Sequence, residues 1–229
     1  LENFPVRGWQ IVNGSLVEAA RESCSSIVEV GVHDEAAVWH ERQIPIPTRD
    51  VAFHCVRGSR LADSVAFWEQ EAAVTMTRGD FRSAAEALGV ASAITFDPQH
   101  KCRLTLDRSA CFAKVHEWNR VTEMLGGLPS RVVSDDPRLG ADHTYLCAEA
   151  INSGGAVGSD EETLRSLFQE SLQYAEQLND PFRQVRALSG LAALEVTDDP
   201  QSAQATLNKA LALQDKHSVS WPPLAIAVF

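Results

Sequence analysis

Residues 61–78 and 80–95 form two alanine-rich amphipathic stretches that are separated only by Gly79. In each stretch the apolar side chains recur with the 3.6-residue period of an α-helix. Glycine permits the backbone angles of a tight corner, and Asp80 is a suitable N-cap for the second helix. Two short helices joined in this way cannot bury their apolar faces alone, so they stack on further helices. The corner therefore predicts an all-α protein assembled from antiparallel helix pairs.

The helical period continues along the chain, whereas strand-like alternation is scarce. Further helix pairs are predicted at residues 98–127, 142–178 and 181–214, with a truncated unit from residue 221. Asp-Pro pairs, which supply an N-cap and a first-turn proline, signal helix starts at residues 97–98, 180–181 and 199–200. Residues 128–140, including Asp136–Pro137, contain two prolines and a glycine and are predicted to form a loop.

Residues 1–60 fit this pattern least well and are predicted as an irregular N-terminal helical segment packed on the array. One helix is predicted to begin near Ser15 and to end at Gly31, and Asp34 is predicted to start a short second helix. The IPIPT stretch at 44–48 is predicted to be irregular, because proline disfavours the α conformation in the residue before it. The chain begins with leucine and ends in the apolar PPLAIAVF, so it is expected to be a fragment of a longer chain.

The first pair resembles a unit of the tetratricopeptide repeat (TPR) family. Its corner and its large and small apolar residues stand where the motif has them: Trp68, Ala72, Gly79, Asp80, Phe81, Ala84, Leu88 and Ala91. Glu71 and Thr75 depart from the motif, which prefers Leu and Tyr there. The pair at 182–214 also follows the motif, while the other pairs are degenerate. The resemblance covers roughly residues 61–229 and implies a right-handed α-solenoid, the TPR-like superhelix. A non-repetitive helical bundle is the alternative.

The formal net charge of −11 limits the classes of partner. A surface of this sign repels nucleic-acid phosphates and anionic lipids, and the sequence has no run of Lys or Arg, so neither partner is expected. The five cysteines are widely spaced without a C-x-x-C motif, which indicates free thiols and an intracellular location, cytoplasmic or nuclear. No stretch reaches the length of a transmembrane helix.

The sequence has no nucleophile elbow, phosphate-binding loop, dinucleotide fingerprint or zinc-protease motif, so a non-enzymatic protein without cofactor is predicted. His33 and His40 lie seven residues apart and would share a face if one helix held both, which makes a metal site conceivable. The preferred interpretation is a solvated helix with Trp39 as its buried anchor. For Cys102 and Cys111, core packing is preferred over metal binding or thiol chemistry.

In the TPR family the first helix of each pair lines a concave groove. The resemblance implies these groove residues on three first helices: Glu69, Ala73 and Met76, then Arg103 and Leu106, then Arg186 and Ser189. Chaperone-binding members have Lys and Asn where Glu69 and Ala73 stand, so a carboxylate clamp for chaperone tails is not expected. The expected lining is mostly small and apolar, which favours an apolar helix or extended segment as the protein partner.

These expectations favour a non-enzymatic protein–protein interaction scaffold, a subunit or domain of a larger intracellular multiprotein assembly. Such a scaffold holds a partner segment on its helical-repeat surface. The alternative is a peptide-sensing regulatory domain of a transcriptional or signalling protein, which requires an effector domain elsewhere in the full-length protein. An enzyme with an unrecognised site is the third hypothesis.

Overall fold

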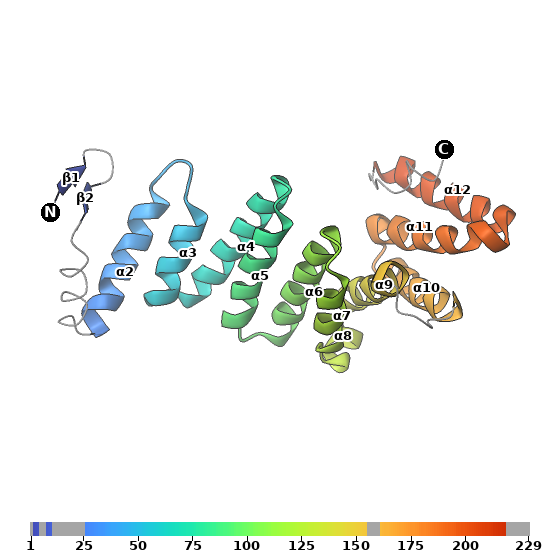
Figure 1. Ribbon diagram of the computed structural model, residues 1–229, viewed down its shortest axis with the longest axis horizontal. Coiled ribbons are helices and arrows are strands. Elements are labelled where there is room, and N and C mark those ends of the chain that lie inside the picture. Colours follow the sequence, from blue (N-terminus) through green and yellow to red (C-terminus); the bar gives the residue numbers. More distant parts are fainter. Residues whose placement is uncertain (1, 5–7, 11–25, 155–160, 219–229) are drawn as a thin grey trace. The chain divides into compact units, whose positions relative to one another are not determined.

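The computed structural model describes residues 2–4, 8–10, 26–154 and 161–218 (Figure 1). Two three-residue strands, β1 (Glu2–Phe4) and β2 (Gly8–Gln10), pair antiparallel, and every other element in this part of the chain is a helix. The helices pack in consecutive pairs, which confirms the predicted all-α class for these residues. The chain divides into two compact units, Leu1–Glu71 and Ala72–Phe229, so the division lies inside helix α4 (Leu61–Thr77).

The first unit contains α2 (Ser26–Glu41), α3 (Thr48–Arg57) and the first part of α4. Ala37 and Val51 form its apolar core with Cys55, and Phe67 packs against them. Residues 42–47, which include most of the IPIPT stretch, are not helical, as predicted.

Two predictions for the first unit are wrong. Helix α2 continues through Gly31, and Asp34 lies in the middle of α2 rather than at a helix start. The carboxylate of Asp34 accepts hydrogen bonds from the backbone N–H and the hydroxyl of Ser59, at 2.8 and 2.7 Å, and these bonds lower the pKa of Asp34. Tertiary contacts therefore carry the helix across a glycine that costs roughly 1 kcal/mol. The predicted start near Ser15 lies outside the described residues.

The second unit contains the rest of α4 and eight further described helices. They are α5 (Phe81–Ile94), α6 (Pro98–Lys114), α7 (Trp118–Gly126), α8 (Ser130–Asp135), α9 (Pro137–Gly154), α10 (Glu161–Gln177), α11 (Pro181–Asp198) and α12 (Pro200–His217). Helix α5 contacts α6, α6 contacts α7, and from α9 to α12 each helix contacts the next (Figure 1). Small residues permit close packing: a Cβ added at Gly190 of α11 would lie 2.4 Å from the ring of buried Phe168 in α10.

Residues 128–140 do not form the predicted loop, because α8 and the start of α9 lie there. Asp136 starts α9 as the other Asp-Pro pairs start helices, and its carboxylate accepts a hydrogen bond from the N–H of Arg138 at 2.8 Å. The predicted helix starts at the other three pairs are confirmed: Asp97, Asp180 and Asp199 each cap the following helix. A first-turn proline is compatible with a helix, so prolines in this segment mark helix starts instead of preventing helices.

The corner at Gly79 recurs twice in the second unit. The connections α4–α5, α6–α7 and α10–α11 each contain one residue with a positive φ: Gly79 (77°), His116 (59°) and Asn179 (51°). In each connection the next residue donates its N–H back to a carbonyl of the preceding helix at 3.0 Å: Asp80 to Thr75, Glu117 to Phe112, and Asp180 to Ala175. This is the Schellman ending of a helix. The α10–α11 corner joins two helices that the sequence analysis assigned to different pairs.

Candidate functional site: a polar groove in the second unit

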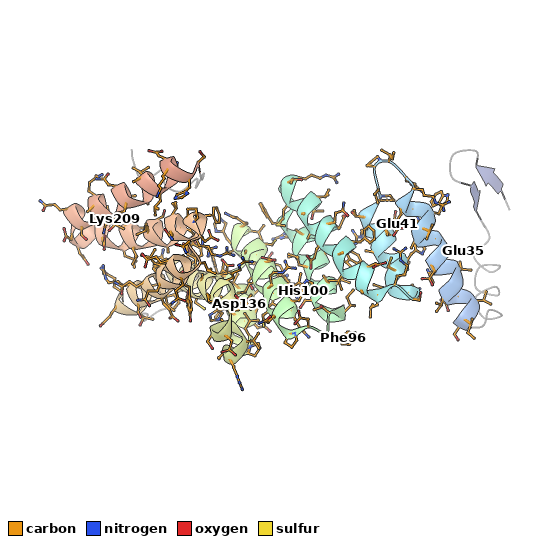
Figure 2. The ribbon with its side chains drawn as sticks, turned by 180° about the vertical axis from the view of Figure 1, so that it is seen from behind. Glu35, Glu41, Phe96, His100, Asp136 and Lys209 are labelled. Atoms are coloured by element: carbon orange, nitrogen blue, oxygen red, sulfur yellow. The ribbon has the colours of Figure 1, made fainter. Side chains whose placement is uncertain are left out.

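A polar cavity of about 570 Å³ lies where α6, α9 and α11 approach one another. We call it the polar groove and define it by its lining residues: Asp97, Gln99, His100, Arg103, Asp107, Asp136, Arg138, Leu139, Asp142, Leu178, Asp180 and Arg183. Figure 2 labels His100 on its α6 side and Asp136 on its α9 side. Most of the lining is charged, whereas the sequence analysis expected small and apolar residues.

Helix geometry brings these side chains together. His100, Arg103 and Asp107 are spaced three and four residues apart, so they share one face of α6. The N-caps Asp97 and Asp136 lie at the starts of α6 and α9, and the start of α11 contributes a third capping aspartate. Three of the four Asp-Pro helix starts, those of α6, α9 and α11, therefore converge on this groove.

Asp142 of α9 is held between two arginines of α11. Its carboxylate accepts from Arg183 Nη2 at 2.6 Å, from Arg183 Nε at 3.1 Å and from Arg186 Nη2 at 2.6 Å. Arg183 also pairs with Asp180 at 2.5 Å, and the guanidinium of Arg186 lies 4.1 Å from the ring centroid of Tyr145. The charged side chains are less than a third exposed, so this network is a fixed wall of the groove.

Arg183 and Asp180 keep their charges near neutral pH. Burial disfavours the charge of Arg183, but hydrogen bonding and attraction to Asp142 outweigh it, so the pKa of Arg183 is raised. Burial also opposes ionisation of Asp180, yet hydrogen bonds from the backbone N–H and the guanidinium of Arg183 lower the pKa of Asp180. Both groups therefore remain ionised in the folded protein.

The α6 wall has a different character, because its charges are exposed. Arg103 pairs with Asp107 at 3.2 Å and contacts His100 at 2.7 Å, and nearly half of each side chain in the Arg103–Asp107 pair is exposed. Exposed pairs of this kind contribute little to stability. The pair can therefore open and each side chain can bind a charged group of a partner, with little loss of folding free energy.

The predicted partner-binding residues of α6 and α11 have different surroundings. Arg103 lines the polar groove, and Arg186 supports it through Asp142. Leu106 is 3% exposed and offers no surface to a partner, because it faces the helices packed on α6. Ser189 is half-buried, and its hydroxyl donates to the carbonyl of Val185 at 2.7 Å.

The predicted residues of α4 are distributed between the two units. Ala73 and Met76 are exposed residues of the second unit, and Glu69 is a half-buried residue of the first.

Phe96 is a candidate that the sequence analysis missed. It lies between α5 and α6, directly before the groove residue Asp97, and it is 89% exposed (Figure 2). An apolar residue before an N-cap commonly packs on the fourth helical residue, which here is Lys101. Because Lys101 is not apolar, the sequence gives Phe96 no such partner, and this could have indicated that Phe96 is exposed.

A second cavity, of about 540 Å³, is lined mainly by apolar residues of α7, α8, α9 and α10. Two polar residues on its wall, His143 and Cys147, lie one turn apart on α9, with Sγ 3.7 Å from Nε2. Burial raises the pKa of Cys147 to about 11 and lowers the pKa of His143. Both side chains are therefore neutral near pH 7, and this pair holds no thiolate for nucleophilic chemistry.

Three histidines come together in the first unit. His33 and His40 lie on α2, and His54 of α3 places its Nδ1 2.8 Å from that of His33, while its ring stacks on His40. Within the described residues, no group of three metal-ligating side chains has the geometry to hold a metal. Trp39 is 49% exposed, so the prediction that it anchors α2 is wrong, and Ala37 has that role.

None of the helices in the described ranges is long and apolar enough to cross a membrane. No protein-family model matches the chain. The search of curated proteins finds no match for it either.

Proposed function

We propose that the chain is a non-enzymatic interaction scaffold, a domain or subunit of a larger assembly, which holds a partner segment in the polar groove. The observation that carries this proposal is the convergence of three helix starts, those of α6, α9 and α11, on one charged groove. A right-handed, TPR-like solenoid would place the first helices of successive pairs side by side in this way. The recurrent corners support that arrangement.

The charges of the groove support a polar partner segment. Outside the Asp142 network, the lining offers the exposed arginines Arg103 and Arg138 and several carboxylates. Complementary charge mainly sets the specificity and the rate of association. A segment with charged side chains of both signs therefore fits this groove better than the apolar helix expected from the sequence.

Phe96 adds an exposed apolar side chain beside the charged lining of the groove. Exposed aromatic side chains are frequent binding hot spots, because they bury a large area at a small entropic cost. The position of Phe96 beside Asp97 suits an anchor at the edge of the groove. The unpaired cysteines Cys55, Cys102 and Cys111 are buried, which supports an intracellular setting for the assembly.

The test is site-specific photocrosslinking in extract from the source cells. A photoreactive amino acid is placed at Gln99 or Arg138 in the groove, or at exposed Lys209 of α12 as the control position (labelled in Figure 2). We expect the two groove positions to crosslink the same protein and the control position to leave it unlabelled. The variants Arg103→Glu and Phe96→Ala should abolish or strongly reduce that crosslink.

Two outcomes would contradict the proposal. Crosslinks that are equally strong from Lys209 would show that the groove has no special role. A groove crosslink that persists unchanged in Arg103→Glu and Phe96→Ala would show that neither the charge nor the aromatic anchor contributes to binding.

A further inference from the structure

Helix α6 has a second, mostly polar face whose side chains do not line the polar groove. Lys101, Thr105, Arg108 and Phe112 are spaced four, three and four residues apart, so they share one face of the helix. This face is turned by roughly 120° from the groove face at the 3.6-residue period. Together with Arg120, Glu123 and Met124 of α7 and residues 127–129, this face lines a separate cavity of about 570 Å³.

This cavity is basic in a strongly acidic protein. Its lining contains the cations Lys101, Arg108 and Arg120 and a single carboxylate, that of Glu123, although the chain carries a net charge of −11. Arg120 is paired with Glu117 at 3.1 Å. Within the described residues, neither Lys101 nor Arg108 forms an ion pair. Two of the three cations that line the cavity, Lys101 and Arg108, are therefore left without an ion-pair partner in this part of the chain.

Arg108 is held in place without being neutralised. Its Nε atom is buried and has no hydrogen-bond partner among the described residues. Its guanidinium carbon lies 5.6 Å from the ring centroid of Phe112, and that of Arg120 lies 4.9 Å from the same centroid. The two arginines thus place like charges around one ring, an arrangement that an anion between them would stabilise.

Helix α5 leaves room for this arrangement. A Cβ added at Gly89 would lie 3.0 Å from the guanidinium carbon of Arg108, so any larger residue there would press on the arginine. The fork of N–H groups of a guanidinium matches the oxygens of phosphate, and a lysine adds a point charge. The packing of Arg108, its unpaired charge and the geometry of its N–H donors therefore all favour a phosphate group as the ligand.

We propose that the cavity lined by Lys101, Arg108 and Arg120 binds the phosphate group of a small anionic molecule. The site lies on a different face of α6 from the groove residues, and it does not depend on the function proposed for the groove. Free phosphate and a larger phosphate-bearing molecule share this chemistry. The size of the cavity leaves room beside the phosphate for further atoms of such a molecule.

The test uses inorganic phosphate and pyrophosphate, titrated separately into the full chain at constant ionic strength. Binding is followed by the NMR signal of the Arg108 Nε–Hε group, which is assigned by its absence in Arg108→Lys. We expect saturable shifts with both probes and a dissociation constant of order 1 mM or below. Tighter binding of pyrophosphate would identify a larger phosphate-bearing molecule as the source, and equal binding would identify free phosphate.

Two variants with the same change of net charge distinguish phosphate binding in this cavity from general electrostatic attraction to the protein. Lys101→Gln should weaken phosphate binding by about tenfold, because it removes a cation from the cavity. Lys209→Gln makes the same change of net charge on α12 and should leave binding unchanged. Lys101 is exposed, so its replacement is expected to leave the fold intact even if Arg108 variants unfold. No saturable shift up to ~20 mM phosphate, or equal weakening by both lysine variants, would overturn the proposal.

Discussion

His116 and Asn179 have the left-handed backbone of Gly79, although each carries a Cβ. For residues other than glycine this conformation costs roughly 1–2 kcal/mol, least for Asn because its side chain can bond locally. The cost is outweighed by the helices on both sides, whose ends the corner hydrogen bonds satisfy. Glycine and asparagine are the usual residues of a left-handed helix end, so the corners at Gly79 and Asn179 carry a sequence signal, whereas the histidine at His116 gives a much weaker one.

Gly79 and Gly31 allow a matched test of backbone conformation, because a Cβ at either position meets no atom within 4 Å. Gly79→Ala should destabilise the protein by about 1 kcal/mol, since alanine resists the positive φ of the corner. Gly31→Ala, in the middle of α2, should stabilise its unit by about 0.5–1 kcal/mol, since alanine favours a helix. Urea unfolding followed by circular dichroism measures both changes. Equal effects of the two substitutions would show that backbone conformation does not control them.

Helix positions could be predicted well where two signals coincide. The Asp-Pro starts at residues 97–98 and 180–181 agree with the apolar periodicity behind them, and both helices begin there. The prediction failed at residues 128–140, because proline and glycine were interpreted as loop signals although they lie in or beside helices. The groove was only partly predictable. Arg103 was identified, but the pairing of Asp142 with α11 requires contacts across 41 to 44 residues of sequence.

One hydrogen bond between α2 and α3 joins two histidine rings, beside the apolar core that these helices share. One of the facing Nδ1 atoms of His33 and His54 must donate and the other must accept, so protonating the acceptor breaks their hydrogen bond. Burial lowers the pKa of His54, and the nearby His33 and His40 lower it further, while Asp50 of α3 opposes this. Glu29 of α2, 4.0 Å from His33, can offset only part of the charge repulsion.

The first unit should therefore lose stability in mild acid. A group whose folded pKa is lowered binds protons more readily when unfolded, so its stabilising effect is complete above about pH 6.5 and declines as the pH falls through the folded value. Urea unfolding followed by the NMR amide signals of Ala37 and Val51 should show lower stability at pH 5 than at pH 7. His54→Asn should reduce this difference, and His217→Asn, at the exposed end of α12, should not. Equal stability at both pH values would contradict the argument.

Most contacts between helices join helices that follow one another in the sequence. Within each unit the helices mainly contact those that precede and follow them, as expected for a protein built from stacked helix pairs. In such proteins a local defect weakens its neighbours most strongly and has less effect on distant elements. The apolar cluster of Val51 in the first unit and the packing around Phe168 in the second are therefore suitable places to perturb.

Phe168→Ala should destabilise the helices around it and spare the first unit. Phe168 is 1% exposed, and its ring lies 5.8 Å from that of Tyr145 in α9 and close to Gly190 in α11. Its truncation leaves a cavity among three helices and should cost about 3–5 kcal/mol there. Hydrogen exchange measured by mass spectrometry should show lost protection in α9, α10 and α11 and unchanged protection in α2 and α3. Val51→Ala is the reciprocal control, since a loss of about 2 kcal/mol should be confined to α2 and α3. If each substitution lowered protection equally in both units, the chain would unfold as one cooperative body, and the division inside α4 would have no energetic meaning.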